Sequence, residues 1–187
     1  MKVIIAGPCG VGKSTIARLL AENANVTHID FDNVRAIDMQ QRHGQASPCS
    51  VSKLDLRECI PLFLNPCVRE FVLDIGGDTV FRRGADNENR LEQTIWLKQT
   101  YGARIILLTA DQTELSRRFL ASKNRKREEF DTAWQDWKEI AEIYWRKCAD
   151  VAIDTTRMCV DDWQKLPVGF PNSHLDFHIT QCSSTNS

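Results

Sequence analysis

Residues 2–15 read KVIIAGPCGVGKST, and this stretch decides the fold. The β-branched run at residues 2–6 predicts a short buried strand, and apolar spacing over residues 13–23 predicts a helix. Between them, residues 7–14 match the P-loop pattern GxxxxGK[ST]. Glycines let backbone N–H groups converge on phosphate oxygens, and a helix N-terminus adds partial positive charge. We therefore predict a nucleotide phosphate site, with a chance match in a glycine-containing turn as the alternative.

The predicted nucleotide contacts are the residues of this loop and of the first helical turn: Gly7, Pro8, Cys9, Gly10, Val11, Gly12, Lys13, Ser14 and Thr15. Lys13 would reach the β- and γ-phosphates and is a candidate catalytic residue, and the Ser14 hydroxyl would ligate Mg²⁺. Cys9 is open to two interpretations. A helix N-terminus lowers a thiol pKa and would make it reactive, or it is simply a small residue that fits the loop.

Downstream, apolar runs alternate with helical patterns. Strands are expected at residues 26–31, 70–75, 104–109 and 151–154, and helices at 33–43, 54–65, 87–101, 112–122, 132–147 and 161–166. This alternation predicts an α/β fold with a parallel sheet between two layers of helices, and a ligand site at the C-terminal ends of the strands. We expect one domain over residues 1–166 and a partly disordered tail over 167–187.

Carboxylates end two of the predicted strands. Asp30 and Asp32 are one residue apart and point to the same side of an extended chain. One would position Mg²⁺ through water, which we assign to Asp30, and Asp32 would hold or deprotonate an acceptor hydroxyl. The alternative is a helix cap, which also suits Asp32. Asp74 in FVLDIGG fits the Walker B position that orients Mg²⁺, and Gly76 and Gly77 either permit close approach to a ligand or make the turn.

A basic stretch follows the fourth strand and helix, reading RRFLASKNRKR over residues 117–127. Such a run is usually a solvated helix face. Its place in the chain favours a lid over about residues 117–130, whose arginines would neutralise charge and exclude water when the lid closes.

Composition narrows the remaining possibilities. The chain has 187 residues, 42% of them hydrophobic, and a net charge of −1, so neither nucleic acid nor a membrane is expected as a partner. It lacks an apolar run of about 18 residues. Seven cysteines, an odd number without a CxxC pair, predict reduced thiols in the cytoplasm, with neither a zinc site nor a disulfide framework. His28 has no partner that the sequence identifies.

Taken together, these motifs resemble the shikimate kinase and gluconate kinase branch of the nucleoside monophosphate kinase-like P-loop proteins. The resemblance covers roughly residues 1–157 and includes the P-loop, DFD at 30–32, the glycine pair, the basic stretch and CADVAIDTT near the end. It implies a five-stranded parallel sheet of order 2-3-1-4-5. It also implies that Arg118 packs on adenine beside Thr155, that Arg125 meets the phosphates, and that Arg57 binds the acceptor with Asp32, Gly76 and Gly77.

The expected activity is transfer of the γ-phosphoryl group of Mg·ATP to a small acceptor, with the protein a monomer or homodimer. Shikimate itself is not expected, because Asp78 replaces a third glycine and Lys126 replaces the proline that follows the lid arginine in shikimate kinases. Two alternatives remain: a stand-alone NTPase or nucleotide-dependent switch, and a protein that binds ATP without turnover. The sequence has no NKxD motif, which weakens a GTPase-type switch.

Overall fold

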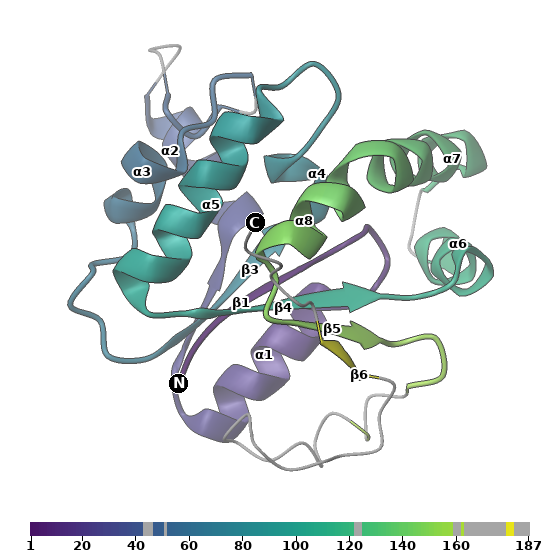
Figure 1. Cartoon of the computed structure of the whole chain (residues 1–187), viewed down its shortest axis with the longest axis horizontal. Helices are drawn as coiled ribbons and strands as arrows, with labels where there is room; N and C mark the ends of the chain where they lie inside the picture. The colour runs from purple at the N-terminus through teal and green to yellow at the C-terminus, as the bar shows by residue number, and fades with distance from the viewer. Residues whose placement is uncertain (43–46, 51, 122–124, 159–161, 163–178, 182–187) are drawn as a thin grey trace.

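Five parallel strands form the centre of the computed structural model, in the order β2-β3-β1-β4-β5 (Figure 1). A sixth strand, β6, pairs antiparallel with β5. The strands are β1 (Lys2–Gly7), β2 (Thr27–Asp30), β3 (Phe71–Gly76), β4 (Arg104–Thr109), β5 (Val151–Asp154) and β6 (Ile179–Gln181). The structure describes residues 1–42, 47–50, 52–121, 125–158, 162 and 179–181. The predicted sheet order is confirmed, whereas β6 was not predicted.

Helices cover both faces of this sheet (Figure 1). They are α1 (Lys13–Ala24), α2 (Phe31–Gln41), α3 (Leu56–Cys59), α4 (Gly77–Val80), α5 (Asn87–Tyr101), α6 (Gln112–Ala121), α7 (Arg127–Asp136) and α8 (Glu142–Cys148). A 3-10 turn, Ile60–Leu62, follows α3, and a π segment, Trp137–Ala141, joins α7 to α8. The predicted helix at residues 161–166 lies outside the described residues apart from residue 162. Among the described residues, no helix is long and apolar enough to span a membrane.

The sheet separates two apolar clusters, and β1 contributes to both. Ile4 faces the cluster that contains Leu97 of α5 and Trp145 of α8. Ile5 faces the opposite cluster, with Leu20 of α1. Both isoleucines are fully buried. A strand that is covered on both sides reads as a continuous apolar run, which is why the sequence at residues 3–6 predicts it well.

The predicted helix at 132–147 begins earlier, at Arg127, and is divided into α7 and α8 by the π segment. Two other helices differ from their predicted bounds for local reasons. The predicted helix at 33–43 begins earlier, because the Asp30 side chain accepts a hydrogen bond from the backbone N–H of Asn33 and caps α2. The predicted helix at 54–65 is reduced to the short α3 and the 3-10 turn. Asp55 caps α3, and Pro61, which lacks an N–H donor, sits inside the 3-10 turn.

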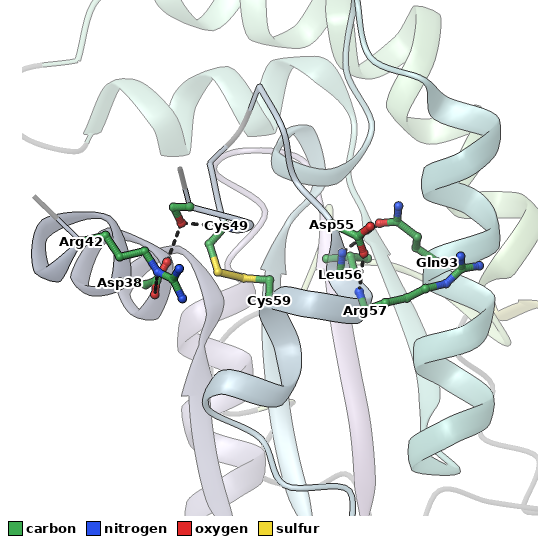
Figure 2. Close-up of a disulfide and its surroundings, with 9 residues drawn as sticks. Asp38, Arg42, Cys49, Asp55, Leu56, Arg57, Cys59 and Gln93 are labelled. Carbon is green, nitrogen blue, oxygen red and sulfur yellow. Dashed lines mark hydrogen bonds and ion pairs between the residues drawn. A yellow bond between two sulfur atoms is a disulfide. The ribbon is translucent and has the colours of Figure 1, made fainter. Parts of the chain in front are cut away.

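A disulfide joins Cys49 to Cys59, so the prediction of reduced thiols without disulfides is wrong for this pair (Figure 2). The two Cα atoms are 5.2 Å apart, and both side chains are fully buried. The bond fastens the segment after α2 to the end of α3, a contact that cysteine spacing alone does not reveal. Cys9 and Cys67 are free thiols. The cytoplasmic location rested partly on reduced thiols and stays a prediction.

Candidate active site

The P-loop connects β1 to α1 in a conformation that glycine makes possible. Gly10 and Gly12 have φ values of 83° and 96°, in the left-handed region that L side chains rarely adopt. At Gly7 a Cβ would lie 2.6 Å from the Leu108 carbonyl oxygen of β4, so only glycine lets the loop pass this close. Gly12 is the N-cap of α1 and offers no side chain to the first helical turn. The free N–H groups there can meet an anion.

Lys13 folds back over the loop. Its ammonium group donates a hydrogen bond to the Pro8 carbonyl oxygen at 3.0 Å. This contact holds the charge above the loop, where the β- and γ-phosphates of a nucleotide would lie in the predicted arrangement.

Asp74 lies on β3 beside the first turn of α1. Its side chain is only 4% exposed and is hydrogen-bonded to Ser14. Asp30 is its direct register partner on β2. Burial raises the pKa of the Asp74 carboxyl, the Asp30 charge raises it further, and the Ser14 hydrogen bond and the Lys13 charge oppose both effects. The structure thus brings together the three residues predicted to hold the metal.

The fit of this group to Mg²⁺ follows from its donor atoms. Among the described residues, no set of three or more His, Cys, Asp or Glu side chains could hold a metal. Mg²⁺ is usually bound by one or two carboxylates together with substrate phosphates and water. A hydroxyl and two carboxylates beside a phosphate loop match that requirement, so the metal would arrive with the nucleotide.

Asp32 occupies a different position from Asp30, because Asp30 caps α2. The Asp32 side chain is about half exposed and accepts a hydrogen bond from the Thr79 hydroxyl at 2.9 Å. Arg35, one turn along α2, brings its Nη2 atom to 3.8 Å from Asp32 Oδ1. The Nε atom of Arg35 is buried without a hydrogen-bond partner in the described structure. Such a desolvated donor is costly unless a ligand satisfies it.

The glycine pair packs against groups of the protein itself. A Cβ at Gly76 would lie 2.7 Å from Asp32 Oδ2, and one at Gly77 would lie 2.6 Å from the Gly7 carbonyl oxygen. Trp137 would collide with the same Cβ of Gly77 at 2.3 Å. These close contacts link the P-loop to Asp32 through the end of β3.

Arg57 lies apart from this group. Its guanidinium is 4.0 Å from Glu92 of α5, and Figure 2 shows the side chain extending from α3 toward α5. No contact among the described residues joins Arg57 to Asp32, so its substrate-binding role stays a prediction.

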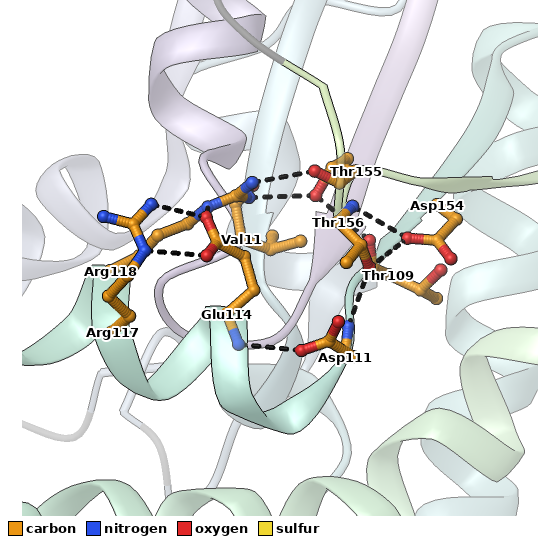
Figure 3. A network of polar contacts seen from close by, with 9 residues as sticks. All are labelled: Val11, Thr109, Asp111, Glu114, Arg117, Arg118, Asp154, Thr155 and Thr156. Atoms are coloured by element: carbon orange, nitrogen blue, oxygen red, sulfur yellow. Dashed lines mark hydrogen bonds and ion pairs between the residues drawn. The ribbon is translucent and has the colours of Figure 1, made fainter.

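On the other side of the P-loop, Arg118 of α6 contacts Thr155 (Figure 3). Its Nη2 atom donates to the Thr155 carbonyl oxygen at 2.7 Å, and its Nε atom donates to Glu114 at 2.6 Å. Hydrogen bonds from Arg117 and Arg118 lower the pKa of Glu114 to about 2. The cavity beside them has a volume of about 400 Å³, room for a small planar group, and is lined by Val11, Gly12, Thr15, Ile16, Leu19, Glu114, Arg117, Arg118, Thr155 and Met158.

Arg125 lies at the start of the segment that leads into α7. Its guanidinium is 5.2 Å from the centre of the Phe119 ring and is about half exposed. The charges of Lys13 and Arg125 both act on the Cys9 thiol and lower its pKa, but burial is larger and the net effect raises the pKa. Phe119 packs on Gly10, so Arg125 lies near the P-loop. Cys9 fits the interpretation of a small packed residue better than that of an activated thiol.

A second cavity lies between the segment after α4 and α7. It has a volume of about 410 Å³ and is lined by Asp78, Arg82, Arg83, Gly84, Ala133 and Asp136. Arg83 donates to Asp136 at 3.0 Å and to Glu139 at 2.7 Å, which connects this segment to the end of α7 and to the π segment.

Sequence reasoning missed three polar side chains of this region. Thr79 has no motif that signals its contact with Asp32. Arg35 had a usable signal, since a residue three positions after Asp32 on a helix shares its face. His28 also had one, because it precedes Asp30 by two positions and so faces the same side of β2.

A family profile described as an AAA domain matches residues 3–135. The chain belongs to the AAA domain family. No match to this AAA domain was found among curated proteins.

Solved structures share the fold of this AAA domain at low sequence identity. Shikimate kinase from Acinetobacter baumannii, in complex with shikimate, has a TM-score of 0.63 at 19% identity, over 88% of this chain and 89% of that one. Shikimate kinase from Bacteroides thetaiotaomicron has a TM-score of 0.59 at 18% sequence identity, over 87% of this chain and 93% of that one. A sugar kinase from Janibacter sp. has a TM-score of 0.55 at 13% sequence identity, over 87% of this chain and 89% of that one. The predicted resemblance to P-loop small-molecule kinases is confirmed at the level of the fold.

Proposed function

We propose that this AAA domain is an ATP-dependent kinase that transfers the γ-phosphoryl group of Mg·ATP to a small acceptor. The observation that carries the proposal is the continuous contact from the P-loop to Asp32. Gly7 packs on Gly77, and Gly76 packs on Asp32, so a half-exposed carboxylate stands beside the phosphate loop. An acceptor hydroxyl needs such a group, whereas a protein that only binds nucleotide has no use for it.

The nucleotide would lie across the N-terminus of α1. The loop N–H groups and Lys13 would hold the β- and γ-phosphates, and the base would enter the cavity beside Arg118 and Thr155. Hydrogen bonds to Glu114 and Thr155 hold the Arg118 guanidinium in place, so one side of this cavity is formed by a fixed planar group. That rigidity supports the role of base platform.

Mg²⁺, when bound, would neutralise phosphate charge and align the phosphates for displacement. Ser14, Asp30 and Asp74 are the residues that would hold it. The Ser14 hydroxyl can donate its proton to Asp74 and keep its oxygen lone pairs for the cation. Oxygen donors of this kind are the ones Mg²⁺ prefers.

In the transfer step, Asp32 would accept the proton of the acceptor hydroxyl. The hydroxyl oxygen forms a bond to the γ-phosphorus while the bond from that phosphorus to the bridging oxygen breaks, and ADP leaves with the electron pair. Lys13 and Arg125 would stabilise the charge on the phosphoryl oxygens. Positioning and electrostatics of this kind account for most catalysis of phosphoryl transfer.

The surroundings of Asp32 favour an acceptor that carries a negative group. Arg35 is largely buried and its Nε atom lacks a partner in the described structure, so an anion would complete its hydrogen bonding. Its Nη2 atom lies 3.8 Å from Asp32 Oδ1. An acceptor that reaches both side chains would therefore carry its anionic group close to its reacting hydroxyl.

The test is ADP release from Mg·ATP, with and without a panel of hydroxylated metabolites and nucleotides, together with detection of the phosphorylated product. Lys13→Ala should abolish the acceptor-dependent rate, and Lys53→Ala, at an exposed position away from the P-loop, should leave it unchanged. Equal ADP release in the presence and absence of every acceptor would instead establish an NTPase with water as acceptor. Asp32 would then lose its proposed role.

A further inference from the structure

His28 of β2 lies against the carboxylate that we assign to the metal. Its Nε2 atom is 3.3 Å from Asp74 Oδ2, with the histidine side chain 25% exposed and the aspartate 4% exposed. His28 is in register with Val72, two residues before Asp74, and side chains two apart share a face of the sheet. His28, Asp30 and Asp74 therefore lie on one face, beside the first turn of α1.

The three polar neighbours of Asp74 are not equivalent. Ser14 lies on the P-loop side of the carboxylate, and Asp30 is a second anion that is already engaged in capping α2. His28 is the neighbour on the sheet itself that can donate a hydrogen bond to Asp74. A buried carboxylate without enough donors is costly and free to rotate, and a donor on one oxygen fixes the direction of the other.

We propose that His28 is a positioning residue for the nucleotide-associated Mg²⁺: its Nε2–H holds Oδ2 of Asp74 so that the carboxylate stays directed toward Ser14 and the phosphates. The inference rests on the proposed nucleotide site and not on the identity of the acceptor. Hydrogen-bonding partners of metal-ligating groups typically change metal affinity by about 10- to 100-fold when removed. We expect a change of that size.

The contrasting interpretation is an ion pair at the edge strand that only stabilises the fold. The two interpretations differ in one measurable quantity, the gain in nucleotide affinity when Mg²⁺ is present. A positioning residue changes this gain and leaves the metal-free nucleotide affinity unaltered. A purely structural residue changes the stability of the protein, and any effect on nucleotide affinity is the same with and without the metal.

The experiment measures the dissociation constant of a non-hydrolysable ATP analogue in Mg²⁺ and in EDTA, for wild type, His28→Val, His28→Gln and Thr27→Val. Valine suits a strand but removes the donor, and glutamine restores an N–H donor of similar reach. Thr27 neighbours His28 on β2 with its side chain on the opposite face, which makes Thr27→Val the matched control. Mn²⁺ binding to each nucleotide complex, followed by electron paramagnetic resonance, reads the metal directly and needs no turnover.

The expected result is a loss of about 10- to 100-fold in the Mg²⁺-dependent gain and in Mn²⁺ affinity for His28→Val, with recovery in His28→Gln and no change in Thr27→Val. An unchanged Mg²⁺-dependent gain in His28→Val would overturn the proposal, and so would an equal loss in His28→Gln. If His28→Val does not fold, His28→Phe replaces it as the variant without a donor. The proposal then requires that His28→Phe loses the Mg²⁺-dependent gain in nucleotide affinity and that His28→Gln keeps it. Failure to find any phosphoryl acceptor would not affect these binding measurements, so the two proposals fail separately.

Discussion

Reduction of the Cys49–Cys59 disulfide is expected to lower the free energy of unfolding by about 2.7 kcal/mol. The bond closes a loop with a sequence separation of 10. The chain-entropy relation gives a loss of about 9 cal/mol/K in the unfolded state for a loop of this length, which is about 2.7 kcal/mol at 25 °C. For a chain of this size the corresponding decrease in Tm is about 5–11 °C.

The surroundings of the disulfide indicate a second, functional effect. On one side, the Ser47 hydroxyl donates to Asp38 of α2 at 2.5 Å, and the backbone N–H of Cys49 donates to the same hydroxyl at 3.0 Å (Figure 2). On the other side, the backbone N–H of Leu56 donates to Gln93 of α5 at 2.9 Å. The bond therefore connects α2, which carries Asp32, to α5. Reduction should raise the KM of the acceptor more than that of ATP.

The assay is urea unfolding of wild type with and without a dithiol reductant, with thiols blocked after each incubation. The Cys49→Ala/Cys59→Ala variant is the control, because its unfolding midpoint should not respond to the reductant. Equal midpoints for oxidised and reduced wild type would refute the argument from loop closure. Alkylation of both cysteines in unfolded, unreduced protein would refute the disulfide itself.

Three further substitutions test the site. Asp32→Asn should lower acceptor-dependent kcat by about 10²- to 10⁴-fold through loss of the proton acceptor, with nucleotide affinity unchanged by direct titration. Arg35→Gln should raise the KM of an anionic acceptor by about 10- to 100-fold, whereas Arg42→Gln, on a guanidinium paired with Asp38 at the end of the same helix, should not. Burial raises the pKa of Asp74 above 3.8, so the folded state binds this proton more tightly and stability falls as pH rises through the window above 3.8. Asp74→Asn should remove that fall in urea unfolding and also reduce the gain in nucleotide affinity that Mg²⁺ provides; identical pH profiles would contradict the assignment.

The parts of the fold that the sequence predicted are those governed by local pattern. β4, β5 and α5 begin and end where the apolar runs and caps place them, because strands buried on both faces and a helix that starts after Asp86 and ends at Gly102 leave clear signals. The sheet order came from the resemblance, since pattern alone does not order parallel strands.

The parts that were missed depend on contacts between distant segments. The disulfide forms because the segment after α2 packs on α3, and seven cysteines permit many pairings. β6 exists only through its pairing with β5, and three residues carry too little pattern to predict it. Arg35 and His28 were visible as same-face neighbours of Asp32 and Asp30, but only the structure shows that one has an unsatisfied donor and the other reaches Asp74.

The DFD motif shows most directly why the site needed three dimensions. The sequence offered a helix cap as the alternative role of Asp32, whereas the structure gives the cap to Asp30. Because β2 ends at Asp30 and α2 starts at once, Asp30 becomes the cap and its carboxylate is held at the strand end, opposite Asp74. Asp32 then falls in the first turn of α2, where its side chain meets Thr79 rather than a backbone N–H. The residue at which α2 begins therefore separates the predicted metal carboxylate, Asp30, from the predicted base, Asp32. A variant in which Asp32 became the helix cap should lose acceptor turnover before it loses nucleotide binding.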